Sequence, residues 1–185
     1  MSKTKRASIA EDIAFENRYV TIVGEISDKV AKSTCEKLLA LASKSDDPIT
    51  IFISSPGGHV ESGDMIHDLI KFIKPVVTVI GSGWVASAGA LIFIGAKLEN
   101  RLCLPNTRFL LHQPSGGVGG AASDIAIQAL QIEIMKERFE RIFAEATGKT
   151  PEQIAKDTAR DFWLNTDEAI SYGLLGKVVT SATEL

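Results

Sequence analysis

The stretch ITIFISSPGGHVESGDMIHDLIKFIKPVVTVI, residues 49 to 80, decides the fold. Its run of β-branched residues at 49–53 is typical of a buried strand, and residues 62–73 carry apolar side chains at helical spacing. The apolar run at 76–80 predicts a second strand. A strand, a helix and another strand in this order predict a βα unit that belongs to a largely parallel sheet.

The same alternation of strands and helices continues on both sides of this stretch. Further strands are predicted at residues 19–23, 109–111 and 177–179. Helices are predicted from the Ser27-Asp28 cap towards residue 43, over 124–147 and over 166–172. Another helix is predicted after Thr150, with Pro151 at its first position and Gln153 completing a capping box. Because no repeat or linker divides the chain, we expect one α/β domain over residues 1–185, with 1–16 as a short polar lead-in.

The predicted helix at 124–147 carries apolar residues on more than one face. A helix of that kind needs either a deep core or a partner chain to cover it. In a domain of this size, a partner chain is the more economical explanation.

Composition and charge exclude several classes of function. The chain has 185 residues, of which 45% are hydrophobic, and a net charge of -3 with dispersed Lys and Arg, which does not indicate a nucleic-acid partner. No apolar run approaches the ~20 residues of a membrane span, and no signal peptide is evident, so we expect a cytoplasmic protein. Cys35 and Cys103 lie in apolar surroundings and are expected to be reduced, buried thiols rather than a disulfide or metal site.

Two glycine-rich places interrupt the strands and helices. Residues 54–58, SSPGG, follow a predicted strand and precede a helix, so their N–H groups can face an anion or an oxyanion, although an ordinary tight turn explains them equally well. They do not form a phosphate loop, because the Gly-Lys-Ser/Thr ending is absent. The second place, residues 115–120, follows His112 and by itself predicts a flexible loop.

Ser87 lies in GSGWVASAGA, residues 81 to 90, directly after a predicted strand. Val85 occupies the first glycine position of the Gly-x-Ser-x-Gly elbow, which disfavours an α/β-hydrolase. The ordinary explanation for this serine is an N-cap hydroxyl at the start of a helix. Catalysis would require a histidine as base and an acid to orient it.

The chain offers three histidines for that role. His67 lies in the middle of a predicted helix among charged residues and is expected on the surface, whereas His59 borders the Gly58 turn and fits either a lining or a catalytic role. His112 is the best candidate base, because it ends a predicted strand and opens into a glycine-rich loop. A structural histidine at that position stays open as the alternative.

Several motifs in order resemble the proteolytic subunits of the Clp protease family. The motifs are Ser-Pro-Gly-Gly at 55–58, Ala-Ser-Ala-Gly-Ala at 86–90, Leu-Pro-Asn at 104–106, His-Gln-Pro at 112–114 and Asp-Thr-Ala-Arg-Asp at 157–161. The resemblance extends from about residue 18 to 179. It implies an α/β fold of the Clp/crotonase type with repeated ββα units, and a serine endopeptidase with Ser87 as nucleophile, His112 as base and then acid, and Asp161 as the orienting carboxylate.

The resemblance also assigns the surroundings of the triad. It implies an oxyanion hole formed by the N–H groups of Gly58 and Ala88, and a peptide or unfolded protein that docks as an added strand between the segment from Val60 and the loop with Ser115 and Gly117. The helix at 124–147 resembles the handle that joins two stacked seven-membered rings into a homo-oligomeric tetradecamer. No metal or organic cofactor is expected, and ATP would be hydrolysed by an AAA+ unfoldase.

Departures from the family pattern leave two other hypotheses open. The polar lead-in is short, the positions that supply aromatic residues for unfoldase docking are Thr50 and Phe52, and His59 replaces an apolar residue. One alternative is a non-catalytic or conditionally active subunit that assembles with a second chain of the same family. The other is an acyl-CoA enzyme of the crotonase fold, against which the three filled triad positions argue.

Overall fold

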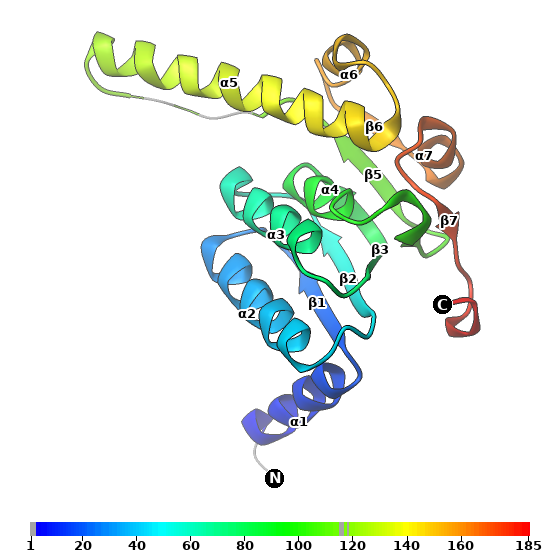
Figure 1. The fold of residues 1–185 in the computed structure, drawn as a ribbon. Coiled ribbons are helices and arrows are strands. Elements are labelled where there is room, and N and C mark those ends of the chain that lie inside the picture. The colour runs from blue at the N-terminus through cyan, green and yellow to red at the C-terminus, as the bar shows by residue number, and fades with distance from the viewer. Residues whose placement is uncertain (1–2, 115–116, 118) are drawn as a thin grey trace.

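The computed structural model describes residues 3–114, 117 and 119–185, with side chains from residue 9 onward (Figure 1). The helices are α1 (Lys3–Glu16), α2 (Asp28–Lys44), α3 (Val60–Phe72), α4 (Ala88–Phe93), α5 (Ala122–Thr147), α6 (Pro151–Asp157) and α7 (Thr166–Tyr172). The strands are β1 (Tyr19–Val23), β2 (Ile49–Ser55), β3 (Val77–Ala86), β4 (Arg101–Cys103), β5 (Arg108–Leu111), β6 (Phe162–Leu164) and β7 (Lys177–Val178). Short 3-10 turns lie at Leu98–Asn100 and Ala182–Glu184.

The strands form a single sheet, in which β1, β2, β3, β4 and β7 lie side by side in that order. These strands are parallel, and β5 also runs parallel to β3, whereas β6 pairs antiparallel with β5. The predicted α/β class with a largely parallel sheet is therefore confirmed. All five predicted strands are present; β4 and β6, with three residues each, gave no pattern long enough to predict.

Strand β3 changes its partner along its length, and this change positions the candidate site. Residues 79–81 pair with β4, and residues 84–86 pair with β5. The sequence predicted that the strand ends at residue 80, because glycines at 81 and 83 weaken a strand pattern. Gly83 has φ +68° and lies between the two pairings, while a side chain at Gly81 would come within 2.9 Å of Val85. The two glycines thus let one strand serve two neighbours.

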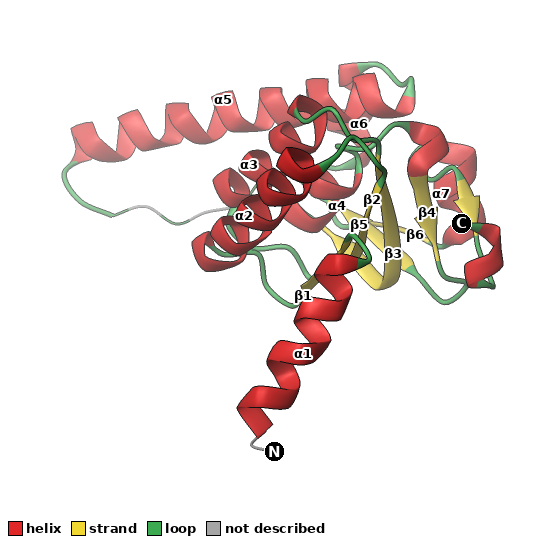
Figure 2. Cartoon of the chain, turned by 60° about the horizontal axis from the view of Figure 1, so that its bottom comes forward, coloured by secondary structure: helices red, strands yellow, loops and turns green. Residues whose placement is uncertain are grey.

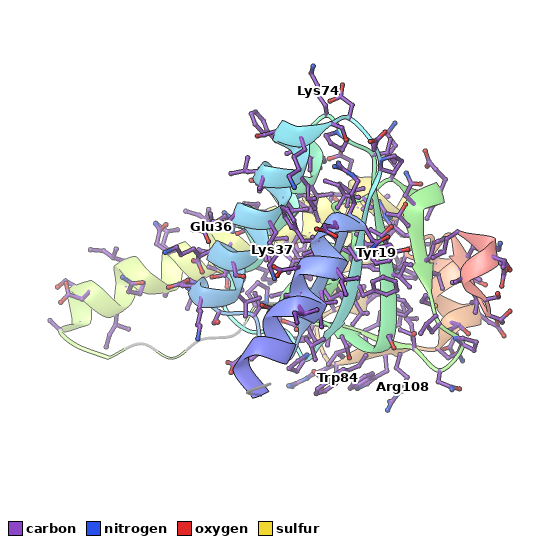
Figure 3. The ribbon with its side chains drawn as sticks, turned by 90° about the horizontal axis from the view of Figure 1, so that it is seen from below. Tyr19, Glu36, Lys37, Lys74, Trp84 and Arg108 are labelled. Carbon is purple, nitrogen blue, oxygen red and sulfur yellow. The ribbon has the colours of Figure 1, made fainter. Side chains whose placement is uncertain are left out.

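One face of the sheet is covered by helices and carries the core. Alternate residues of β2 are fully buried beneath the helices, and α2 and α3 lie on the same side of the sheet (Figure 2). The opposite face keeps exposed side chains, among them Tyr19 and Trp84 (Figure 3). Trp84 is paired with Arg108 across β3 and β5, and the Arg108 guanidinium lies 4.2 Å from the Trp163 ring.

Helix α5 extends well beyond the rest of the chain, and only its C-terminal part is anchored (Figures 1 and 2). Phe139 and Phe143 are buried with their ring centroids 4.2 Å apart. Arg101 ties the end of α5 to β4, because its buried guanidinium donates to the carbonyl of Ala146 at 2.8 Å. The extended part exposes four large apolar side chains: Ile125, Ile127, Leu130 and Ile134.

The predicted helix ends are largely confirmed. Ser27 caps α2 by accepting from Val30 N, and Thr150 caps α6 by accepting from Gln153 N. The predicted capping box at Gln153 is wrong, because its side chain donates to Asp157 one turn later. The lead-in, from which no helix was predicted, forms α1 from residue 3.

Both cysteines are free and buried, as predicted. Burial raises the pKa of the Cys35 thiol and raises that of Cys103 to about 11. Neither thiol is therefore a reactive nucleophile at neutral pH. Over the described residues, no helix is both long enough and apolar enough to cross a membrane.

We expect the centre of β2 to dominate the stability of the fold. Ile51 is 0% exposed in the core, so Ile51→Ala should lower the free energy of unfolding by about 2–5 kcal/mol. Val23 on β1 is 75% exposed, so Val23→Ala should change it by less than about 1 kcal/mol. Urea unfolding at one fixed protein concentration measures both, and equal losses for the two variants would contradict this view of the core.

Candidate active site

Ser87 lies between the end of β3 and the start of α4 in an unusual backbone conformation. Its φ and ψ angles are 53° and −121°, a region that residues with a side chain rarely occupy. Its amide donates to the carbonyl of Leu110 at 2.9 Å, which locks it against β5. Backbone strain of this kind persists only where the surroundings enforce it, and it clusters at functional sites.

The hydroxyl of Ser87 does not cap the helix that it precedes. Ser87 occupies the N-cap position of α4, yet its side chain makes no cap hydrogen bond. The ordinary explanation of this residue as a capping hydroxyl is therefore wrong. An N-cap serine needs extended backbone angles to reach the N2 or N3 amide, and the angles of Ser87 lie elsewhere.

The Ser-Pro-Gly-Gly turn packs directly against Ser87. A Cβ atom at Gly57, where φ is +96°, would lie 2.6 Å from the Ser87 Cβ and 3.1 Å from its Oγ. The Gly57 amide donates to the buried Oγ of Ser55 at 3.0 Å, which fixes the turn at the end of β2. Only glycine allows the two backbones to approach this closely.

His112 and Asp161 flank the end of an antiparallel strand pair. Residue 112 follows β5 and residue 161 precedes β6, and the last register pair of these strands is Leu111 with Phe162. Extension of this register by one residue places His112 opposite Asp161. Since Ser87 is bonded to Leu110 on the same strand, the three residues lie at one edge of the sheet.

The side chain of His112 points its Nδ1 atom at a backbone carbonyl. The Nδ1 atom lies 2.8 Å from the carbonyl oxygen of Gln113, and because a carbonyl only accepts, Nδ1 carries the proton. In the neutral imidazole, Nε2 is then the nitrogen that keeps its lone pair, as a general base requires. Among the hydrogen bonds of residues 3–114, 117 and 119–185, none joins His112 to Ser87 or to Asp161.

The loop that carries Asp161 is held against the strand that carries His112. The Gln113 amide donates to the carbonyl of Thr158 at 3.0 Å, and its side chain donates to that of Ala159 at 3.2 Å. Asp157 at the start of this loop accepts from the Tyr172 hydroxyl at 2.8 Å. The part played by Leu110 and Gln113 was not predicted from the sequence, because both act through a strand register that only the fold defines.

The Gly58 and Ala88 amides adjoin the contact between Gly57 and Ser87. Gly58 lies outside any helix, and Ala88 is the first residue of α4, where an amide has no partner within the helix. In the part of the chain that the structure describes, neither amide donates to another group. Both positions assigned to the oxyanion hole thus have a donor to offer.

The structure describes the predicted docking segments only in part. Val60 is the first residue of α3, so a docked strand can pair only with the backbone up to that point. Gly117 is exposed, whereas Ser115 lies outside the described residues. The part played by these three residues stays a prediction.

The other two histidines differ in their surroundings. The prediction of a surface position for His67 is wrong, because its side chain is buried while the neighbouring Asp68 is exposed. It lies on the face of α3 that also buries Ile66 and Ile70, and its Nδ1 bonds to Asp68 at 2.9 Å. His59 is exposed at the start of α3, next to Gly58. Within the described ranges, no group of three metal-ligating side chains gathers.

Comparison with known proteins assigns the family. The family model for Clp protease matches residues 2–182. The chain is 60% identical over 184 residues to the ATP-dependent Clp protease proteolytic subunit of Paracoccus denitrificans, which covers all of this chain and 92% of the relative. It is 59% identical to the proteolytic subunit 2 of Pseudomonas aeruginosa, over 94% of this chain and 87% of the relative.

A solved structure agrees with this assignment. ClpP1 from Listeria monocytogenes superposes with a TM-score of 0.86 at 50% identity, over 96% of this chain and 99% of that chain. The fold and the family match define a serine-type hydrolase of the Clp type. The chain belongs to the Clp protease family, as its proteolytic, serine endopeptidase subunit.

The close approach of Gly57 and Ser87 generates a prediction. Gly57→Ala should lower peptide hydrolysis at least about 100-fold, because the new methyl group would displace the Ser87 side chain. Gly24→Ala is the matched control, since Gly24 has a similar φ of +92° but no atom within 4 Å of the added methyl. Both variants carry the cost of a left-handed alanine, so equal losses of activity would contradict the proposed contact.

Proposed function

We propose that Ser87, His112 and Asp161 form the catalytic triad of this Clp-type serine endopeptidase. The observation that carries the proposal is the conformation of Ser87: its backbone is strained, its amide is locked to Leu110, and its hydroxyl is left unused by the helix that follows. A capping serine would instead have extended backbone angles and a hydroxyl that accepts from the N2 or N3 amide. The antiparallel register of β5 and β6, which ends with Leu111 opposite Phe162, supports the other two members, because His112 and Asp161 are the next residue of each strand.

The chemistry follows from these positions. As the Ser87 Oγ attacks the peptide carbonyl carbon, its proton passes to the His112 Nε2, and the carbonyl oxygen becomes an oxyanion. The Gly58 and Ala88 amides donate to that oxygen. His112 then gives the proton to the leaving amine, which leaves an acyl group on Ser87. Water then attacks the acyl carbon while His112 takes its proton. His112 returns this proton to the Ser87 Oγ as the acid product leaves.

Alignment of the triad requires one change in hydrogen bonding. The Nδ1 proton of His112 now points at the Gln113 carbonyl, and it must turn to Asp161 for the carboxylate to stabilise the imidazolium. The exposed Asp161 lies in a loop already tied to Gln113, which supports a rotation of side chains without a change of the backbone. The substrate, a peptide or an unfolded protein, would pair with the backbone near Val60 and with the loop that contains Ser115 and Gly117.

The assembly that fits this chain is a pair of stacked seven-membered rings. The exposed apolar residues of α5 would be covered by a second copy, as its isolated position in Figure 1 suggests. An AAA+ partner would hydrolyse ATP and feed the chamber. Phe52, which lies in a T-shaped contact with Tyr19 at 5.7 Å, provides an aromatic pair on the open sheet face for that partner.

A second candidate function rests on the side-chain arrangement of the triad. Because His112 bonds to the Gln113 carbonyl, the chain alone fits a conditionally active subunit that becomes competent on assembly, with its own copies or with a second chain of the family. The two candidates differ only in what the chain does before it assembles.

Labelling with a fluorophosphonate probe tests the proposed nucleophile. The wild-type protein should be labelled at one site, and Ser87→Ala should abolish labelling and peptide hydrolysis. Ser55→Ala removes a nearby hydroxyl that supports the Gly57 turn and should retain labelling at a reduced rate. Labelling of Ser87→Ala at the wild-type rate would contradict the assignment.

Light scattering on the same samples separates the two candidates. If the triad is aligned in every copy, the labelling rate per chain should be the same for dispersed and ring-sized particles. If assembly aligns it, labelling should appear only in fractions with the mass of rings.

A further inference from the structure

The inward-facing row of side chains on β2 ends in a polar residue. Ile49, Ile51 and Ile53 face the helix-covered core, and Ser55, the last residue of the strand, continues this row at 0% exposure. A buried hydroxyl costs free energy unless it forms a hydrogen bond, and Ser55 forms its bond with the glycine turn. An alanine would fill nearly the same space without that cost, so the presence of a hydroxyl is explained by the segment that it holds.

The Ser55 hydroxyl fixes the first half of the glycine turn. Its Oγ accepts from the Gly57 amide at 3.0 Å, which closes a local turn around Pro56. The Pro56 ring sets the φ angle of that residue. The peptide plane between Pro56 and Gly57 is therefore held by the ring on one side and by the Ser55 Oγ on the other.

The second half of the turn is fixed by the backbone that follows β1. The Ile26 amide donates to the Gly57 carbonyl at 2.8 Å, and the His59 amide donates to the Ile26 carbonyl at 2.9 Å. Because a peptide unit is planar and trans, the bond to the Gly57 carbonyl also sets the direction of the Gly58 N–H, which points the opposite way. Gly57, with φ +96°, thus lies between two peptide planes that are each held by a hydrogen bond.

The Ser55 side chain also contacts the helix that carries the second amide. Gly89, in the first turn of α4, packs so closely that a Cβ atom there would lie 3.0 Å from the Ser55 Cβ and 3.3 Å from its Oγ. Ala88, which directly precedes Gly89, provides the other donor assigned to the oxyanion hole. One buried side chain therefore contacts both segments that carry the proposed donors.

We propose that Ser55 is a positioning residue that holds the Gly58 N–H in the direction in which it stabilises the oxyanion. This inference rests on the proposed role of Gly58 in the oxyanion hole. Without the Ser55 acceptor, the plane between Pro56 and Gly57 is released, and adjacent glycines adopt many backbone conformations at little cost. A donor that must be reoriented during the reaction stabilises the oxyanion less than one that is already in place.

Hydrolysis of a short fluorogenic peptide by Ser55→Ala tests the proposal, because this change removes the acceptor and keeps the Cβ atom that packs on Gly89. We expect kcat to fall about threefold to thirtyfold, less than the ~100-fold or more of a lost donor, since the Gly58 amide is still present. KM should stay within about twofold. The rate of fluorophosphonate labelling should fall by the same factor as kcat. Ser55→Cys, whose sulfur is a weak acceptor, should lie between the wild-type protein and Ser55→Ala.

Thr34→Ala is the matched control for a general loss of stability. Thr34 is 3% exposed within α2, so this variant also removes a buried hydroxyl, but none of the bonds that hold the glycine turn involves it. At a temperature well below the unfolding transitions, its kcat and labelling rate should equal those of the wild-type protein. Light scattering should give the same molecular mass for all variants. An unchanged kcat in Ser55→Ala, or an equal loss in Thr34→Ala, would overturn the proposal.

Hydrogen exchange separates this proposal from the proposed function. Exchange in residues 54–60 should be faster in Ser55→Ala than in the wild-type protein, because the Gly57 amide loses its acceptor, and it should be unchanged in Thr34→Ala. Unchanged exchange in Ser55→Ala would refute the positioning role. Faster exchange, together with labelling and hydrolysis that persist in Ser87→Ala, would support the hydrogen bond in the turn and refute the proposed function instead.

Discussion

The hydrogen bond from the Ser87 amide to the Leu110 carbonyl is the contact on which the candidate site depends. It ends β3 against β5 and holds Ser87 at φ 53°, from which its side chain is directed away from the cap of α4. An alanine or serine relaxes from such angles unless its neighbours prevent it. Here Gly57 packs beside the Ser87 side chain, and α4 packs so closely on β2 that a Cβ atom at Gly89 would lie 3.0 Å from the Ser55 Cβ. The packing of a turn, a strand and a helix around Ser87 thus offsets the free-energy cost of its strained backbone.

The candidate site also requires that β3 pairs with β4 along one part of its length and with β5 along another. If β3 paired with β4 along its whole length, β5 would have no place beside Ser87, and the antiparallel β6 would not bring Asp161 to the same edge. The division of β3 therefore links the sheet to the chemistry. It also explains why nucleophile, base and acid arrive from residues 87, 112 and 161, which are widely separated in the chain.

The sequence predicted most of this architecture from periodicity alone. The alternation of buried strands and helices, the caps at Ser27 and Thr150 and the long apolar α5 follow from local patterns, and all are confirmed. The motifs at Ser87, His112 and Asp161 then indicated a family that the comparisons confirm. Local patterns failed where a tertiary contact decides the outcome. Three-residue strands have no period to detect, and the charged neighbours of His67 concealed that its own face of α3 is buried.

A high-resolution structure of the protein after reaction with a fluorophosphonate tests the central claim most directly. The account predicts phosphorus bonded to the Ser87 Oγ, its oxygen within hydrogen-bond distance of the Gly58 and Ala88 amides, and the His112 Nδ1 turned from the Gln113 carbonyl to Asp161. A phosphonylated Ser87 with His112 still on Gln113 and no contact to Asp161 would contradict it.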